Sequence, residues 1–339
     1  MSPLRRVAAL RPSTRAYAGL CLASIAWASA FIFGKVVLAE ISALSAGAWR
    51  HALAALVLLP IAWRARHRAN LHAARIPLAV MIVCGGVFYP WTFLAALERT
   101  SATNTSLLIA LNPALTFLLA PLVGERYTRH GLLGIALALI GASLVITHGD
   151  IAVLTSLSAA RWGDLLALVA AALWATFNLA SRGVVAHVPN ALTNALVYGL
   201  GCLALFALAS PQHPLQQIAH ASPAAVGSLL AMVALSSVLA GQLFLYGVHT
   251  VGVGRTVVFV YIVPVLTAVA SSLLLKEPLL PAQIVGGAAV LAGVYVATRT
   301  PAERKTRRAG GATAATSPAS LAAEARDASA AVADRRAVR

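Results

Sequence analysis

Ten apolar runs follow one another along the chain, and each is close to the length that an α-helix needs to cross a lipid bilayer. Such a helix takes about 20 predominantly apolar residues, within a range of about 17 to 25. The stretch around Thr147–Leu157 is shorter and contains Asp150, so it is interpreted as a loop. We therefore predict an all-α polytopic membrane protein with ten transmembrane helices. The expected spans are Ala16–Ala39, Ala43–Ala62, Ile76–Ala96, Ser101–Leu122, Gly131–Ile146, Gly163–Gly183, Ala191–Ala209, Ala224–Val248, Arg255–Leu275 and Pro281–Ala297.

The composition excludes most soluble folds. Of the 339 residues, 60% are hydrophobic and 11% are charged, whereas about 25% of an ordinary soluble domain is charged. So few charged side chains cannot cover a water-facing surface of this size. Cys21, Cys84 and Cys202 lie in separate apolar runs with neither a CxxC spacing nor a paired histidine, so we expect no disulfide, metal site or other cofactor.

Basic residues are distributed unevenly between the expected loops. If the amino terminus is inside, seventeen lysines and arginines up to Arg308 fall on the inner side, and only Arg99, Arg161 and Lys276 fall on the outer side. This pattern predicts a multi-pass protein of the cell inner membrane with both termini in the cytoplasm. Topology and anionic lipid also account for the net charge of +16, so we expect no nucleic-acid partner.

The two ends of the chain differ from the apolar runs. Residues 1–15 form a basic amino terminus, and the run that follows is longer than the 7 to 15 or so residues of a signal-peptide core, so we expect it to stay as the first helix. Residues 299–339 are rich in alanine, serine, threonine and charge, which is typical of a disordered tail. Between these ends we expect a first repeat over 16–147, a connecting loop over 148–162 and a second repeat over 163–298.

The two halves of the chain match one another at offsets of 147 to 152 residues. Each half contains five expected helices, and an odd number forces the second copy to enter the membrane from the opposite side. The result is an inverted repeat, from which many secondary transporters are built. The matching pairs are Trp27 with Trp174, Lys35 with Arg182, Phe93 with Phe244, Ala102 with Val253, Pro113 with Pro264, and Glu125, Gly134 and Gly141 with Glu277, Gly286 and Gly293.

Several of these residues also form a recognisable order. Four features follow one another along the chain: the stretch from Trp27 to Lys35, Arg50 in the second span, Pro113 before the Gly124–Glu125 pair, and the later Lys276–Glu277–Pro278 turn. Together they resemble the EamA-type transporters of the drug/metabolite transporter superfamily. The resemblance covers about Tyr17 to Ala297. It implies a ten-helix inner-membrane carrier, commonly one that exports amino acids, metabolites or toxic compounds. The second half departs from the first at one place, because the position matching Arg50 is Val197.

Arg50 is the main candidate for substrate contact. It lies about seven residues, or about 10 Å, into its expected helix. A charge at that depth is costly and is a functional candidate by default, although its guanidinium could instead reach the headgroups. Lys35 and His51 are weaker candidates, since Lys35 lies near a span end and His51 points about 100° away from Arg50.

Polar and aromatic residues within the spans are the other cavity candidates. An aromatic cavity suits apolar, aromatic or cationic solutes, but helix packing alone would also explain each residue. The proposed substrate-binding set is Arg50, Trp27, Tyr89, Trp91, Trp174, Asn178, Gln242, Tyr246 and Tyr261.

Three prolines and two glutamates are candidates for gating residues. Pro113 and Pro264 fall inside the fourth and ninth expected spans, at equivalent places in the two repeats, and Pro90 falls in the third. A proline there removes a backbone hydrogen bond and kinks the helix, so these residues are predicted to be gating hinges or fixed bends. Glu125 and Glu277 follow span ends and are interpreted as helix caps or gate latches.

Sequence features of proton relays and of several enzyme classes are missing. The acidic residues of the membrane region fall at or beyond span ends, so no strong proton carrier is visible. Walker, HExxH and paired intramembrane aspartate motifs are also missing. We predict that the chain is no enzyme but a secondary transporter that exports a small organic solute by alternating access, with a passive channel or a membrane sensor subunit as the alternative. The oligomeric state is left open between monomer and homodimer.

Overall fold

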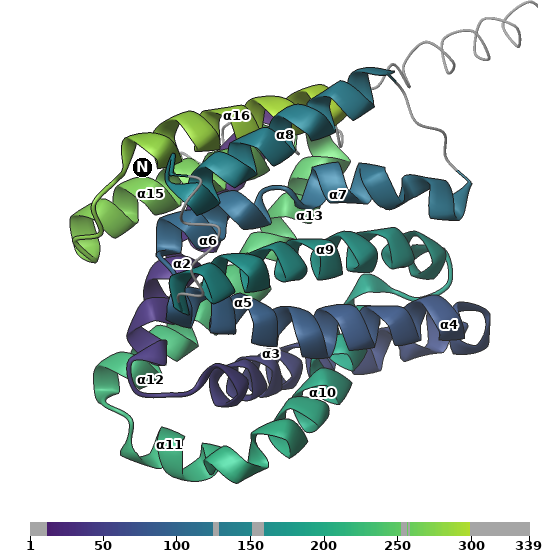
Figure 1. Cartoon of the computed structure of the whole chain (residues 1–339). Helices are drawn as coiled ribbons and strands as arrows, with labels where there is room; N and C mark the ends of the chain where they lie inside the picture. Colours follow the sequence, from purple (N-terminus) through teal and green to yellow (C-terminus); the bar gives the residue numbers. More distant parts are fainter. Residues whose placement is uncertain (1–11, 125–128, 151–158, 252–255, 257, 299–339) are drawn as a thin grey trace, which may run out of the picture. The chain divides into compact units, whose positions relative to one another are not determined.

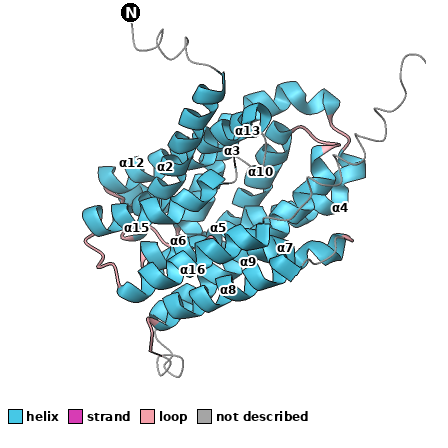
Figure 2. Ribbon diagram, turned by 90° about the horizontal axis from the view of Figure 1, so that it is seen from above, coloured by secondary structure: helices cyan, strands magenta, loops and turns pink. Residues whose placement is uncertain are grey.

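The structure, a computed structural model, describes residues 12–124, 129–150, 159–251, 256 and 258–298. Every regular element within these ranges is a helix (Figures 1 and 2). Glu125, the start of the ninth expected span and the expected tail lie outside them.

The helices of the first half match the first five expected spans to within a few residues. The largest difference is in the third span, which begins at Leu71 and not at Ile76. The elements are α2 (Pro12–Leu38), α3 (Ala43–Ala65), η1 (Arg66–Arg68), α4 (Leu71–Met81), η2 (Ile82–Phe88), α5 (Tyr89–Arg99), α6 (Ala102–Ile109), α7 (Asn112–Leu119), η3 (Ala120–Val123) and α8 (Arg129–Thr147).

The second half repeats this order from α9 onward. Its seventh-to-eighth connection carries an additional short helix, α11, which lies between the two expected spans. The elements are α9 (Ala159–Val185), α10 (Asn190–Ala209), η5 (Ser210–Gln212), α11 (Pro214–His220), α12 (Pro223–Ala231), η6 (Met232–Leu239), α13 (Ala240–Val251), η7 (Val258–Tyr261), α15 (Ile262–Leu274) and α16 (Pro281–Thr298).

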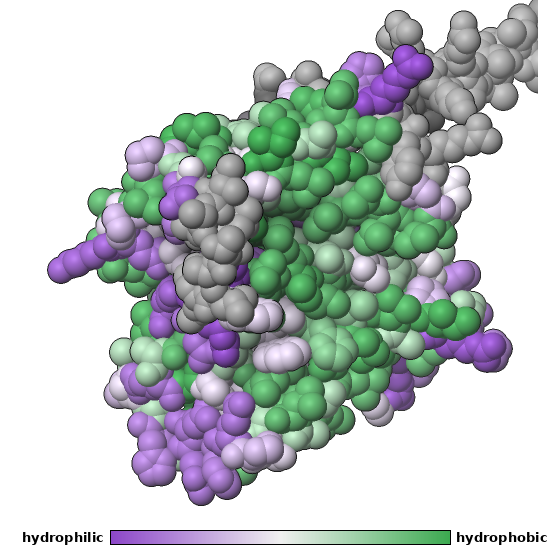
Figure 3. Space-filling view, viewed as in Figure 1, coloured by the Kyte–Doolittle hydropathy of each residue, from purple (hydrophilic) through white to green (hydrophobic). Residues whose placement is uncertain are grey.

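The surface of the helical body is suited to lipid. Within the described residues, eight helices are long and apolar enough to cross a membrane, and Phe259–Leu274 and Pro281–Ala297 are shorter apolar helices. Many large apolar side chains are exposed, among them Leu56, Ile140 and Leu273. Figure 3 shows these side chains over much of the visible face, with hydrophilic side chains toward its edges. Soluble monomers rarely expose so much apolar surface, so the chain is a polytopic α-helical membrane protein, and the count of ten spans stays a prediction.

The last helices of the two halves pack against each other through matching glycines. Helices α8 and α16 lie side by side (Figure 1). A Cβ atom placed on Gly134 would lie 2.6 Å from the Gly293 carbonyl oxygen, and one placed on Gly293 would lie 2.6 Å from the Gly134 carbonyl oxygen. Gly141 and Gly286 oppose each other in the same reciprocal way, at 2.6 and 2.7 Å. Small residues let membrane helices approach this closely, and the reciprocity is what a two-fold relation between the halves would produce.

Two π-helical segments interrupt the third and eighth spans at equivalent places. They are η2 and η6, which begin at Ile82 and Met232. The sequence analysis did not predict them. A π-helical turn is rare and often marks a functional site.

The three prolines expected at hinges each follow a change in helix type. A two-residue turn separates α6 from α7, and Pro113 is the second residue of α7. Pro264 lies in the first turn of α15, directly after the 3-10 helix η7, and Pro90 lies in the first turn of α5, directly after η2. A first-turn proline costs little, because its missing N–H would have no partner within the helix. Pro90 and Pro113 thus lie inside the helical spans Leu71–Arg99 and Ala102–Leu122, as expected, each at a change of helix type, and their role as hinges or bends stays a prediction.

Candidate substrate site

Arg50 joins the second span to the π-helical break in the eighth. Its Nε atom donates to the Ser237 hydroxyl at 3.1 Å, and its Nη2 atom donates to the Ser236 hydroxyl at 3.0 Å. The guanidinium carbon lies 5.9 Å from the centre of the Phe93 ring, within the range of a cation–π contact. Among the described residues no carboxylate forms an ion pair with Arg50. The guanidinium is thus held inside the bundle by neutral groups and a ring.

The two serines come from the wide π-turn of η6. Ser236 is buried and Ser237 is half-buried. Neither residue was among the predicted site residues. A signal was present in the repeat, because the offset of 151 that relates Phe93 to Phe244 also relates the small pair Gly85–Gly86 to Ser236–Ser237.

A row of aromatic rings begins beneath Arg50. Phe93 stacks on Tyr89 with ring centres 6.0 Å apart, Tyr89 lies 4.7 Å from Trp174, and Trp174 stacks on Phe177 at 4.8 Å. We call Phe93, Tyr89, Trp174 and Phe177 the aromatic row. It runs from α5 to α9, so it crosses from the first half of the chain to the second. All but the buried Phe93 are half-buried.

Four other predicted cavity residues lie in separate contacts. Trp27 packs on Phe244 with ring centres 5.4 Å apart, and Trp91 lies 6.3 Å from Phe88. The Asn178 amide donates to the Asn112 side-chain oxygen at 3.3 Å. These contacts are ordinary helix packing, as is that of Tyr261, which packs against the buried cluster around Leu111.

Gln242 and Tyr246 do not join the Arg50 group. They lie one turn apart on an exposed face of α13, and 42% of Tyr246 is accessible. The structure therefore brings together Arg50, Tyr89 and Trp174 of the predicted set. The remaining residues keep no contact with Arg50 among the described hydrogen bonds and ring contacts.

His51 faces away from the guanidinium, as its position predicts. Its ring is buried and meets Tyr198 edge-on, with ring centres 4.8 Å apart. Its Nδ1 atom lies 3.2 Å from the Gly47 carbonyl oxygen. His51 thus packs α3 against α10.

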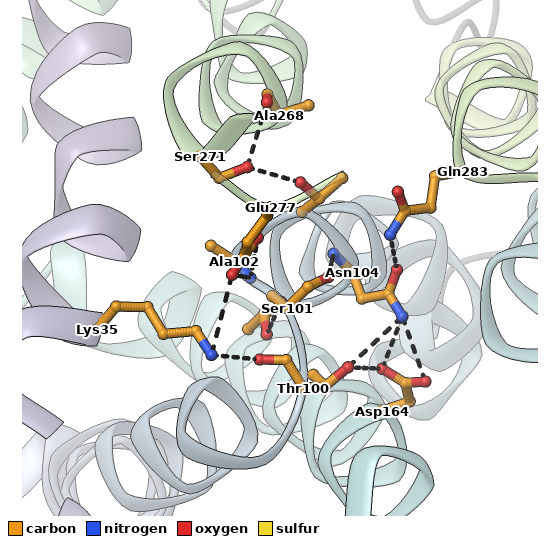
Figure 4. Close-up of polar contacts among 12 residues, drawn as sticks. Lys35, Thr100, Ser101, Ala102, Asn104, Asp164, Ala268, Ser271, Glu277 and Gln283 are labelled. Carbon is orange, nitrogen blue, oxygen red and sulfur yellow. Dashed lines mark hydrogen bonds and ion pairs between the residues drawn. The ribbon is translucent and has the colours of Figure 1, made fainter. Parts of the chain in front are cut away.

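Glu277 lies at one end of the bundle and caps a helix. Both of its carboxylate oxygens accept from the Ala102 backbone N–H, at 3.1 and 3.0 Å, at the start of α6 (Figure 4). A carboxylate at a helix amino terminus is favoured by the helix dipole. Lys35 lies 4.0 Å from the same carboxylate and donates to the Thr100 carbonyl oxygen at 2.8 Å. Glu277 therefore connects α2, α6 and the start of the last span.

Asp164 extends these contacts to α9 and α16. It is almost fully buried and accepts from the Thr100 hydroxyl at 2.7 Å and from the Asn104 amide at 3.2 Å (Figure 4). The Asn104 side-chain oxygen in turn accepts from the Gln283 amide at 2.7 Å. The sequence analysis placed Asp164 at a span end and gave it no role. We call the connected set the Asp164–Glu277 network; its members are Lys35, Thr100, Ala102, Asn104, Asp164, Glu277 and Gln283.

Comparison with known proteins agrees with this architecture. The model of the EamA-like transporter family matches residues 14–147 and again residues 161–299. The chain belongs to the EamA-like transporter family. It is therefore a membrane transporter, and the family expected from the sequence is confirmed.

Several relatives of this EamA-family chain are named as transporters. It is 28% identical over 278 residues to the uncharacterized transporter YyaM of Bacillus subtilis, covering 81% of this chain and 90% of YyaM. It is 26% identical over 254 residues to a probable amino-acid metabolite efflux pump of Salmonella typhimurium, covering 70% of this chain and 82% of the pump. A solved crystal structure shares the fold, with a TM-score of 0.52 and 21% identity, over 82% of this chain and 95% of the other.

Proposed function

We propose that this transporter is a secondary carrier that exports a small organic solute, and that Arg50 and the aromatic row form its substrate site. The observation that carries the proposal is the hydrogen bonding of Arg50 to Ser236 and Ser237. This contact joins an intramembrane charge of one repeat to a helix break of the other. Carriers with inverted repeats commonly bind their substrates at such a junction.

The breaks in the spans support alternating access. Each half has a π-helical segment and, later, a helix that restarts at a proline. At such breaks the backbone has fewer helical hydrogen bonds to lose when the two ends of a span tilt relative to each other. We assign Pro90, Pro113 and Pro264 to these hinges.

The Asp164–Glu277 network is the proposed latch of one gate. It connects Lys35 and Thr100 of the first repeat to Asp164, Glu277 and Gln283, which all follow residue 160. The positive-inside rule puts this end of the bundle on the outer side. The described state is then closed on the outer side, and transport would require the network to open.

Export is proposed from the relatives. The Salmonella typhimurium relative is named a probable efflux pump for amino-acid metabolites, and a Streptantibioticus cattleyicolor protein, 28% identical over 199 residues, is named a probable terminal-alkyne amino-acid exporter. Both names describe outward movement of small organic molecules.

Counterflow in proteoliposomes tests the carrier. Vesicles would be loaded with one of a panel of amino acids or aromatic or cationic compounds, and uptake of the labelled compound would be followed with and without a pH gradient. We expect saturable uptake that depends on unlabelled solute inside. Flux that rises linearly with concentration, or the complete lack of exchange by folded protein, would contradict the proposal.

A further inference from the structure

We propose that the substrate carries one carboxylate group and an aromatic body, with the carboxylate on Arg50 and the ring on the aromatic row. This inference rests on the proposed carrier function and deepens it by naming the class of solute. It differs from the sequence-based view that the cavity suits apolar, aromatic or cationic solutes.

The first step is the unmatched charge of Arg50. Its described partners are two hydroxyls and the face of Phe93, all of them neutral. Arg50 is half-buried, and a charge withdrawn from water is costly unless an opposite charge pairs with it. The Nη1 atom makes no hydrogen bond with a described residue, so this edge of the guanidinium is available. A planar guanidinium binds a carboxylate through two parallel hydrogen bonds.

The second step is the number of charges that the site can match. Arg50 has Val197 as its counterpart in the other repeat, and there the chain is close-packed, since a Cβ placed on Gly86 would lie 2.5 Å from the Val197 carbonyl oxygen. One fixed positive charge suits one negative charge. A phosphate group carries about −1.5 to −2 at neutral pH and would be only partly neutralised by a single arginine.

The third step is the lack of a nearby acid. Glu40, Glu98, Asp164 and Glu277 all lie at or near span ends, and none is a described partner of Arg50 or the aromatic row. A solute with an amine and no acid would therefore meet the repulsion of Arg50 without a carboxylate to receive it. Neighbouring rings with centres 4.7 to 6.0 Å apart, most of them half-buried, favour a flat body beside the carboxylate.

Three small probes separate the parts of this ligand. They are 3-phenylpropionate, which has the ring and the acid, 2-phenylethylamine, which has the ring and an amine, and L-phenylalanine, which has all three groups. Binding to the purified full chain in detergent would be measured by calorimetry. We expect 3-phenylpropionate and L-phenylalanine to bind in competition with each other, and 2-phenylethylamine to bind at least about tenfold more weakly.

Variants locate the binding. In Arg50→Gln we expect the affinity for 3-phenylpropionate to fall about 10- to 100-fold, which is the usual effect of losing hydrogen bonds to a charged group. The affinity of Arg50→Lys should lie between those of the wild type and Arg50→Gln, because lysine keeps the charge but loses the planar two-donor geometry of the guanidinium. Arg64→Gln, at the end of the same helix, is the matched control and should bind normally, and elution as a single species checks folding.

The proposal fails if the amine binds as well as the acid, if wild-type protein does not bind the acid, or if Arg50→Gln keeps its affinity. The affinities of the three probes are compared on wild-type protein, so this test does not depend on the folding of a variant. Exchange of other solutes without binding of the acid would remove this inference and leave the carrier. Binding of the acid without exchange of any solute would contradict the carrier itself.

Discussion

The second span packs on the π-helix of the eighth, and the seventh span packs on the π-helix of the third. In the first of these contacts, Arg50 meets the hydroxyls of Ser236 and Ser237. In the second, the corresponding residues are Val197, Gly85 and Gly86, and the backbones approach closely. The same framework thus holds a polar site on one side and a dry, close-packed joint on the other. The duplicated fold supplies the geometry, and a few substitutions in one copy supply the chemistry.

Moving the arginine from the first contact to the second should give the largest decrease in transport. In the double variant Arg50→Val, Val197→Arg the guanidinium would face Gly85 and Gly86, which offer no hydroxyl group and no space. We expect counterflow to fall at least about tenfold and to stay as low as in Arg50→Val alone. Recovery of transport in the double variant would show that the two contacts are interchangeable.

Protein stability should depend more on the close-packed contact at Gly86 and Val197 than on the polar contact at Arg50. Gly86→Ala places a Cβ atom 2.5 Å from the Val197 carbonyl oxygen, and such overpacking costs about 1–3 kcal/mol. The matching substitution Ser237→Ala removes one hydrogen bond to Arg50 and no packing, so it should lower transport with little loss of stability. Thermal unfolding in detergent would measure the first effect and counterflow the second. A stable Gly86→Ala protein would contradict the close-packed description.

Sequence patterns were sufficient for most of the framework. Span length and hydropathy predicted the helices to within a few residues, because burial in lipid requires long apolar runs. The repeat matches Gly134 with Gly286 and Gly141 with Gly293, and in the structure Gly134 packs on Gly293 and Gly141 on Gly286. The helix breaks were harder to predict, since a proline marks a break without telling whether it bends a helix or begins a new one.

The partners within the site were not predictable from one sequence. Ser236 lies 186 residues after Arg50, and no local pattern shows that a π-turn will present its hydroxyl. Asp164 was assigned to a span end with no role, and its partners, Thr100 and Asn104, precede it by 64 and 60 residues, so no local pattern shows them. Periodicity indicates which face of a helix is buried, but not which polar groups meet there.

Substitution of Glu277, at a helix end, should have a smaller effect. Its carboxylate caps α6 and pairs with Lys35. Glu277→Gln removes the charge and keeps one acceptor oxygen. Loss of a cap costs about 0.5–2 kcal/mol, so we expect a comparable decrease in stability and faster opening of the proposed latch. Unfolding and turnover, each compared with Lys35→Met, would measure both. If neither changes, the network is no latch.

The smallest expected effect is a change of stability with pH, and it concerns two matching turns. Glu40 accepts from the Ser222 backbone N–H and hydroxyl, both at 2.6 Å, whereas at the matching turn of the other repeat the Asn70 N–H donates to the His187 backbone carbonyl at 2.8 Å. The hydrogen bonds from Ser222 lower the pKa of Glu40. This contact therefore stabilises above the usual glutamate pKa and is lost as the pH falls through the lowered value. Thermal unfolding against pH should show a slight acid loss that Glu40→Gln abolishes, and an identical profile for both proteins would contradict it.

Counterflow by Arg50→Ala and Arg64→Ala, at equal amounts of folded protein, tests whether transport depends on the intramembrane charge at Arg50. Both substitutions remove an arginine from α3, but Arg64 is exposed in its last turn. We predict that Arg64→Ala exchanges solute at close to the wild-type rate and that Arg50→Ala exchanges it at least about tenfold more slowly. Equal rates in the two variants would remove Arg50 from the substrate site.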